Sequence, residues 1–237
     1  MENAGLGRVA ALWRYPVKSM AAEPMEAIDV SWHGLEGDRR WAFVRPGLER
    51  SGFPWLTIRE RSDMGLYRPA FSDPSRPEAS PTLVRTPAGE ELDVTDPALA
   101  AELGDGVRGI RQNRGVFDAM PLSLTTTQAV QAVGGLVDTE LDPRRFRPNL
   151  LIDAPDGSPF PEDGWLGFVL RIGGLRMRVD RRDERCVIVN VDPATGERAP
   201  SVLKAVGRER DACHGVYGST VTPGRVAVGD AVVLEGT

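Results

Sequence analysis

Short apolar runs recur along the chain and are separated by Gly, Pro and Asp, a pattern typical of β-strands joined by tight turns. The pattern predicts strands at residues 9–14 and 41–44, and the run CVIVNV predicts a buried strand at 186–191. Two pairs of runs flank two-residue turns and predict hairpins: 168–172 with 175–179 around Gly173-Gly174, and 225–228 with 231–234 around Gly229-Asp230.

Helical signals are few and short. Asp96-Pro97 precedes a predicted helix at 98–103, Thr residues precede one at 126–133 that Gly134 ends, and a third is expected at 201–206. The stretches 69–90 and 153–164 are rich in Pro and polar residues and are expected to be surface loops. The chain is therefore predicted to be mainly β with a few short helices, as in a barrel or a sandwich.

The composition is that of an ordinary globular protein. The chain has 237 residues, of which 41% are apolar and 27% charged, so it is long enough for a proper core and too apolar for disorder. Its net charge of −5 argues against nucleic-acid binding. No apolar run is long enough to span a membrane, and the N-terminus lacks the pattern of a signal peptide, so a cytoplasmic protein is expected.

The common enzyme templates are absent from the sequence. There is no dinucleotide-binding or P-loop glycine motif, no G-x-S-x-G and no H-E-x-x-H, and His33 and His214 are the only histidines. Cys186 and Cys213 are too few for a disulfide scaffold and too far apart for a zinc knuckle. The remaining candidates are cationic and thiol positions.

Two of these candidates lie in the first forty residues. Tyr15-Pro16-Val17-Lys18-Ser19 ends a predicted strand in a turn that presents an ammonium and a hydroxyl, which suits an anion seat, although an exposed Lys at a strand end is the simpler interpretation. In 34–41 (GLEGDRRW), a Gly-rich turn delivers Arg39, for which a surface ion pair with Asp38 is the alternative.

Two further candidates lie in the second half. Phe146-Arg147-Pro148-Asn149 leads into an apolar run, so Arg147 and Asn149 are expected at the start of a barrel strand. In Arg185-Cys186 the neighbouring cation favours the thiolate, a nucleophile or soft-metal ligand, whereas a small buried hydrophobe is the structural alternative. Cys213 lies in a polar run and is treated as structural.

Taken together and in order, the motifs YPVKS, GDRRW, FRPNLLI, RCVIVNVDPATG and GVYGSTVTPGRVAVGD resemble the MOSC superfamily, named for the C-terminal domain of molybdenum-cofactor sulfurase. The subgroup most similar has an N-terminal MOSC-associated β-domain and is typified by the mitochondrial amidoxime-reducing component and its bacterial homologues. The resemblance implies a β-rich domain over 5–112 followed by a MOSC β-barrel over 113–237.

The resemblance also implies a site for a molybdenum–pterin cofactor in its terminal-phosphate form. Cys186 corresponds to the protein ligand of molybdenum, and Asp192 is a weak candidate for proton delivery, with capping of the DPATG turn as the alternative. The implied cofactor contacts are Lys18, Ser19, Arg39, Arg147, Asn149, Arg185 and Tyr217. Ala119-Met120 and Glu184 depart from the family pattern, and a carboxylate at 184 is expected to be paired with Arg181 or Arg182 or to point away.

The activity that the resemblance implies is reduction of N-hydroxylated or N-oxide small molecules with electrons from a separate flavin or iron–sulfur reductase. A sulfur carrier or sulfurtransferase with a persulfide on Cys186 requires the same thiolate and remains open. A cofactor carrier without turnover is the third possibility. The sequence indicates neither nucleic acid nor membrane as a partner.

Overall fold

The structure, a computed structural model that describes residues 4–155 and 157–235, is built on a closed β-barrel. Every neighbouring pair of barrel strands is antiparallel except β10 and β11, which are parallel. In order around the barrel the strands are β1 (Ala4–Arg14), β11 (Leu150–Asp153), β10 (Leu122–Thr126), β14 (Cys213–Thr222), β13 (Leu175–Glu184), β12 (Val169–Ile172) and β16 (Ala231–Leu234), which pairs with β1.

Apolar and polar residues alternate along the strands, so that the apolar side chains point into the barrel and form its core. In β13, Leu175, Met177 and Val179 are fully buried, whereas the Arg residues between them face outwards or are only partly covered. The equivalent inward positions of the other strands, such as Leu124 and Ile152, complete one apolar cluster inside the barrel.

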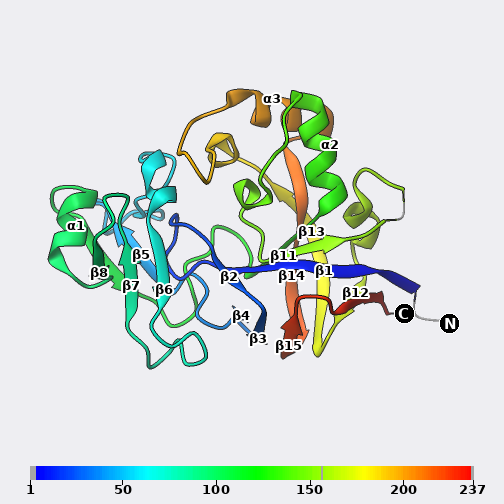
Figure 1. The fold of residues 1–237 in the computed structure, drawn as a ribbon, viewed down its shortest axis with the longest axis horizontal. Helices are drawn as coiled ribbons and strands as arrows, with labels where there is room; N and C mark the ends of the chain where they lie inside the picture. The colour runs from blue at the N-terminus through cyan, green and yellow to red at the C-terminus, as the bar shows by residue number, and fades with distance from the viewer. Residues whose placement is uncertain (1–3, 156, 236–237) are drawn as a thin grey trace.

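A second β-rich lobe lies beside the barrel and holds a core of its own (Figure 1). It consists of the pair β5 (Trp41–Val44) and β9 (Arg108–Arg111), the sheet β6 (Arg68–Phe71), β7 (Thr82–Arg85) and β8 (Glu91–Asp93), the helix α1 (Pro97–Leu103) and the 3-10 turn η1 (Ser62–Leu66). The expected fold class, mainly β with a barrel and a second β-rich part, is confirmed.

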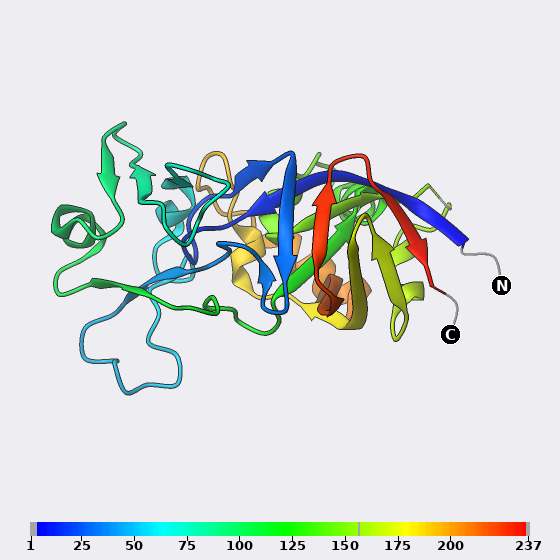
Figure 2. The ribbon, with the colours of Figure 1, turned by 90° about the horizontal axis from the view of Figure 1, so that it is seen from below.

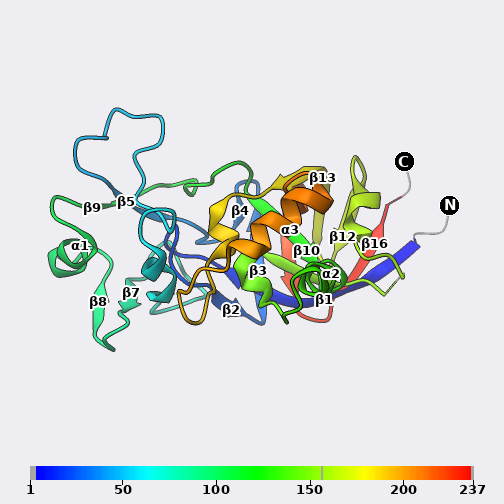
Figure 3. The ribbon, with the colours of Figure 1, turned by 90° about the horizontal axis from the view of Figure 1, so that it is seen from above.

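The N-terminal strands belong to the barrel side of the molecule. β1 is a barrel strand, β2 (Glu23–Met25) pairs with it, and β3 (Ala27–Ser31) pairs with both β4 (Gly34–Leu35) and β15 (Gly224–Ala227). Figures 2 and 3 show β16 and the start of β1 at the end of the barrel away from the lobe. The predicted domain boundary between residues 112 and 113 stays a prediction, and its second part includes residues 236–237, which lie outside the described residues. Strands β1 and β3 pair with strands on the other side of this boundary.

Two helices lie side by side against the barrel, α2 (Thr127–Val137) and α3 (Pro200–Arg210) (Figure 1). The Thr126 hydroxyl caps α2 by accepting from the amide of Ala129, as its sequence predicts. The helix continues past Gly134, where the missing side chain lets the carbonyl of Thr139 approach closely, so the expected end at that glycine is wrong. Within the described residues, no helix is both long and apolar enough to cross a membrane.

Three further predictions require correction. The run at 186–191 is not a strand: β13 ends at Glu184, and Cys186 directly precedes the 3-10 turn η4 (Val187–Asn190). A short apolar run alone does not distinguish a strand from such a turn. The strands around Gly229-Asp230 form, as β15 and β16, but in different sheets. The stretch 69–90 is not one long loop, since β6 and β7 pair within it.

The hairpin at Gly173-Gly174 and the helix α1 behind the Asp96 cap are confirmed. Arg147 does not begin a barrel strand, because it ends the 3-10 turn η2 (Pro143–Phe146) three residues before β11.

A buried carboxylate anchors the 3-10 turn η3 (Pro161–Trp165) to the first turn of α2. Glu162 is fully buried, and its Oε2 accepts a hydrogen bond from the Thr126 hydroxyl at 2.7 Å, while its Oε1 has no partner among the described residues. Burial raises the pKa of Glu162 to about 7.

The Glu162 carboxyl holds its proton more tightly in the folded protein than in the unfolded chain. Its contribution to the stability of the fold is therefore complete below pH about 4.5 and is lost as the pH rises through about 7. We expect Glu162→Gln to remove a pH-dependent loss of unfolding free energy on the order of 2 kcal/mol, measured by urea denaturation between pH 4.5 and 8. The exposed Glu197→Gln serves as control and is expected to retain the slope. An unchanged slope in Glu162→Gln would contradict this assignment.

Candidate functional site

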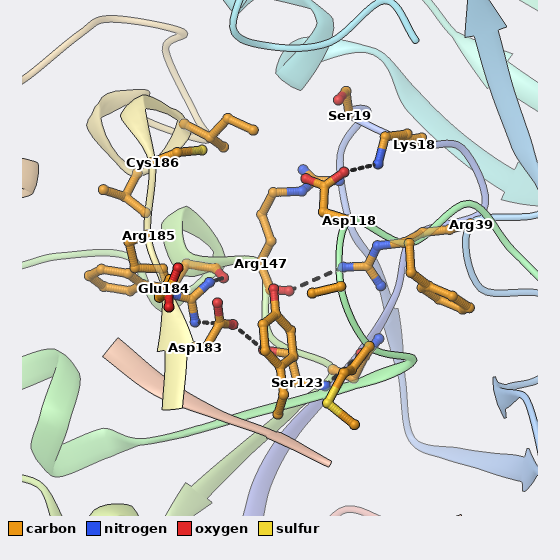
Figure 4. A pocket seen from close by; sticks show the side chains of 18 of the residues that line it. Lys18, Ser19, Arg39, Asp118, Ser123, Arg147, Asp183, Glu184, Arg185 and Cys186 are labelled. Carbon is orange, nitrogen blue, oxygen red and sulfur yellow. Dashed lines mark hydrogen bonds and ion pairs between the residues drawn. The ribbon is translucent and has the colours of Figure 1, made fainter. Parts of the chain in front are cut away.

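A cavity of about 310 Å³ opens between the barrel and the lobe. Figure 4 shows its two walls: Lys18, Ser19 and Arg39 come from the N-terminal segments, and the stretch Asp183–Cys186 from the end of β13. Seven lining residues are Lys or Arg and three are Asp or Glu, although the whole chain carries a net charge of −5. The cavity therefore concentrates positive charge in an acidic protein.

One buried carboxylate, that of Asp38, joins three of the segments that form this cavity. Its Oδ1 accepts from the amide of Tyr15 at 2.7 Å, and its Oδ2 accepts from the Asn149 side-chain amide at 3.2 Å and forms an ion pair with Arg39. Asn149 in turn donates to the carbonyl of Trp13 and accepts from the amide of Ser123. Asn149 is thus a buried connector of strands as well as a lining residue.

Three residues at this junction adopt the left-handed backbone conformation: Ser19, Arg39 and Arg147, with φ of 68°, 50° and 52°. The conformation is unfavourable for residues with a side chain and persists only where the surrounding contacts enforce it. Here it turns the chain at the end of each segment and places the side chain on the cavity wall.

The rings and guanidinium groups behind the wall form a stack. The Tyr15 ring is fully buried between Arg39 and Arg147, whose guanidinium carbons lie 4.6 and 4.3 Å from its centroid. Burial raises the pKa of Tyr15 to about 12, so its hydroxyl stays protonated and donates to the carbonyl of Pro148.

Arg147 carries an unsatisfied donor. Its Nη1 donates to the carbonyl of Met20 at 2.9 Å, whereas its buried Nη2 has no hydrogen-bond partner among the described residues. Burial lowers the pKa of Arg147 to about 10, which leaves it charged at neutral pH. A buried cationic donor without a partner fits a site for an anion.

Lys18 and Ser19 are both buried in the turn after β1, so the alternative of an exposed Lys at a strand end is wrong, while the anion seat stays a prediction. The Lys18 ammonium donates to the carbonyl of Val116 at 3.2 Å and forms an ion pair with Asp118. Burial lowers the pKa of Lys18, and the Asp118 carboxylate opposes this effect.

Arg185 is held by the protein itself. Its Nε and Nη2 donate to the carbonyl of His214, its Nη1 donates to the carbonyl of Phe146, and its Nη2 also forms an ion pair with Asp183 at 2.6 Å. Asp183 additionally accepts from the Ser123 hydroxyl at 3.1 Å, and burial raises its pKa to about 6. These bonds fix the backbone that leads into Cys186, and the predicted cofactor contact of Arg185 stays a prediction.

Cys186 is partly exposed on the cavity wall, where its Sγ accepts a hydrogen bond from Arg59 at 3.4 Å. Cys213 is buried in β14, with its thiol against the carbonyl of Asp211, and agrees with the structural role expected for it. Glu184 is exposed at the cavity wall. Of the two cysteines, only Cys186 lines the cavity.

The structure brings eight of the nine predicted site residues to this cavity. Asp192 is the exception: it accepts from the amides of Ala194 and Thr195 and pairs with Arg145, as a turn-capping residue does. Tyr217 lines the cavity beside Asp183, and burial with this neighbouring carboxylate raises the pKa of its hydroxyl well above the usual range.

Several lining residues were not predicted from the sequence, chiefly Arg59, Asp118, Ser123 and Asp183. Asp118 lies directly before Ala119-Met120, which the motif comparison had singled out, so its position carried a signal. Arg59 lies in a loop of the lobe with no such signal, and only the approach of lobe and barrel brings it to the thiol.

We expect Asp38→Ala to lower the free energy of unfolding by about 3–5 kcal/mol, because it leaves the Arg39 charge and the Tyr15 and Asn149 donors without their partner. The control Asp29→Ala breaks an exposed ion pair with Arg225 and should cost less than about 1 kcal/mol. Chemical denaturation measures both, and equal small effects would contradict the role of Asp38 as a connector.

Comparison with known proteins agrees with this architecture. Residues 111–233 match the MOSC domain, and residues 6–102 match the MOSC N-terminal beta barrel domain. The crystal structure of the YUAD protein from Bacillus subtilis superposes with a TM-score of 0.56 at 13% identity, covering 100% of this chain and 99% of that one, and thus shares the fold.

The curated relatives are longer proteins. The chain is 28% identical to a molybdenum cofactor sulfurase of Drosophila grimshawi over 82% of its length, and 30% identical to that of Drosophila melanogaster, also over 82%. It spans 29% of the length of each of these relatives. With a family match over more than half of its residues, the chain belongs to the MOSC domain family.

Proposed function

We propose that this chain binds a molybdenum–pterin cofactor through its terminal phosphate and reduces N-hydroxylated or N-oxide small molecules. The observation that carries the proposal is the meeting, in one cavity, of a partly exposed thiol with a cluster of buried and half-buried cations, among them Arg147, whose Nη2 has no hydrogen-bond partner among the described residues. The names of the curated relatives link the family to the same cofactor.

The side chains present fit such a group. A phosphate requires several charge-assisted donors from different segments, and Lys18, Ser19, Arg39 and Arg147 supply them from the ends of β1 and η2 and from the turn after β4. The Cys186 thiolate is the soft donor that molybdenum accepts. The cavity volume of about 310 Å³ lies at the lower end of the range for small-molecule sites.

The chain itself contributes binding and orientation. The Asp38 and Tyr15 contacts preorganise Arg39 and Arg147, so that little conformational freedom remains to be lost when an anion binds. Arg185 and Asp183 hold the backbone that presents the Cys186 thiol. The cofactor, when bound, supplies two-electron chemistry at molybdenum with transfer of an oxygen atom.

In this proposal a flavin or iron–sulfur reductase supplies the electrons. The mouth of the cavity is the place where a small substrate would enter, since Cys186 and Arg59 are both partly exposed there.

A sulfur-carrier role for Cys186 is the second candidate, and the names of the relatives as sulfurases favour it. The thiol would take a sulfur atom from a low-molecular-weight persulfide, forming the Cys186 persulfide and releasing the donor as a thiol. The hydrogen bond from Arg59 to Sγ would orient the Cys186 side chain in either role. A mass increase of one sulfur on Cys186 that a reductant removes, in protein free of molybdenum, would favour this role.

Elemental analysis and pterin fluorescence of protein from a host that makes the cofactor test the first proposal. We expect about one molybdenum atom per chain, lost in Cys186→Ser because the serine hydroxyl is a poorer soft ligand. Cys213→Ser is the matched control and should retain the metal. Equal metal content in both variants would contradict the assignment of Cys186.

Lys18→Ala and Arg147→Ala are each expected to weaken cofactor binding by about 10-fold or more, because a hydrogen bond to a charged group contributes roughly 1.5–3 kcal/mol. The control is Lys204→Ala, which removes the other lysine of the chain from the exposed face of α3. Pterin content after dialysis measures occupancy, and circular dichroism verifies the fold. Full occupancy in both cavity variants would exclude the phosphate seat.

A further inference from the structure

Arg59 differs from the other cations of the cavity in the donors it leaves open. Both hydrogen bonds that the structure gives its guanidinium leave from Nη2, one to Cys186 Sγ and one to Asp118 Oδ2, each 3.4 Å long. An arginine has five N–H donors, so Nε and Nη1 of this side chain, which is 31% exposed, make no hydrogen bond among the described residues. In Arg185, by contrast, Nε, Nη1 and Nη2 all donate hydrogen bonds to backbone carbonyls.

The position of Arg59 is fixed by contacts from both parts of the molecule. Arg198, from the loop after η4, donates to the carbonyls of Ile58 and Arg59, both at 3.2 Å. The Arg59 amide donates to the hydroxyl of buried Thr57, which itself donates to Glu60 at 2.6 Å. The backbone of Arg59 is therefore held against the barrel side of the cavity.

An aromatic ring restrains the side chain. The Phe53 ring lies 5.2 Å from the Arg59 guanidinium carbon and 5.7 Å from the Lys18 nitrogen, so it lies within cation–π range of both charges. A guanidinium held in this way loses little conformational freedom when it binds an anion.

The carboxylate of Asp118 shows that Lys18 and Arg59 can bind an oxyanion between them. The two oxygens of Asp118 join Lys18 to Arg59, and the 3.4 Å contact with Arg59 is longer than a good charge-assisted bond. The opposing charges at the mouth are Asp118 itself and the exposed Glu184. Asp118 and Cys186 Sγ engage the same nitrogen of Arg59, Nη2, so the guanidinium lies beside the thiol and its other two nitrogens are not used by Asp118.

We propose that Arg59 is a specificity-determining residue which binds an anionic group of the substrate beside Cys186, so that the site prefers small molecules carrying a carboxylate or a similar oxyanion near the reacting atom. The substrate assignment rests on the proposed function, whereas the anion preference at the thiol does not. The lobe would thus supply the recognition of charge, and the barrel the thiol.

A pair of alkylating reagents that differ only in charge tests this preference directly. Iodoacetate carries a carboxylate and iodoacetamide is neutral, and both attack the same thiolate with loss of iodide. The ratio of their rate constants therefore cancels the thiolate fraction of Cys186. The chain of 237 residues, made in a host without the cofactor and carrying Cys213→Ser, leaves Cys186 as the reacting thiol.

We expect this ratio, normalised to that of a small free thiol, to fall about 5- to 10-fold in Arg59→Gln, as loss of one partly exposed charge-assisted contact implies. Arg59→Lys should retain part of the preference. The control Arg181→Gln removes another lining arginine, whose guanidinium lies against the ring of Tyr217, and should change the ratio by less than about 2-fold. An unchanged ratio in Arg59→Gln, or equal losses in both glutamine variants, would overturn the proposal.

The loaded enzyme provides a second readout. For a neutral amidoxime and its carboxylate-bearing analogue, Arg59→Gln should raise the KM of the charged compound alone, with kcat little changed; an equal rise for both compounds would contradict the role. If the protein bound no molybdenum and reduced neither compound, the proposed function would fail, and the alkylation ratio would still decide the role of Arg59.

Discussion

The site depends on the burial of one carboxylate at a place where three chain segments end. Asp38 is 1% exposed, and its two oxygens receive the amide of Tyr15, the side chain of Asn149 and the guanidinium of Arg39. A buried charge is stable only when its bonds are complete, so each of these partners is confined to one position. The end of β1, the turn after β4 and the entry to β11 are thereby joined, and the cavity wall is built on that junction.

The contacts that hold these segments in place also explain why several residues at the cavity have unfavourable backbone conformations. Ser19, Arg39 and Arg147 are left-handed, and each lies at the end of a segment that Asp38 or its partners hold. The cost of each conformation is on the order of 1 kcal/mol or more and is offset by the contacts around it. As a result the cationic side chains are fixed before any ligand arrives, and Arg147 retains a buried donor that has no partner in the described part of the chain.

The sequence predicted those parts of the structure that local chemistry determines. The Gly173-Gly174 hairpin follows from turn geometry, and the Asp96 and Thr126 caps follow from the preference of helix ends for such side chains. The cationic positions were found because the motifs at 15–19, 37–41 and 146–149 resemble a known family. The structure places them in one cavity, while their cofactor contacts remain predictions.

Other features depend on contacts between distant residues and left no local pattern. The run at 186–191 has the composition of a strand, yet β13 ends before it because the Arg185 side chain is tied to His214 and Phe146 and the chain turns into η4. Arg59 lies in a loop of the lobe, and Arg198 helps to hold that loop near Cys186 through hydrogen bonds to two of its carbonyls. The barrel side of the cavity presents the thiol of Cys186 together with Lys18, Arg39 and Arg147. The lobe places a further guanidinium with open donors across the entrance, and since loops vary more readily than barrel strands, this entrance is where selectivity for substrates can change while the buried junction stays intact.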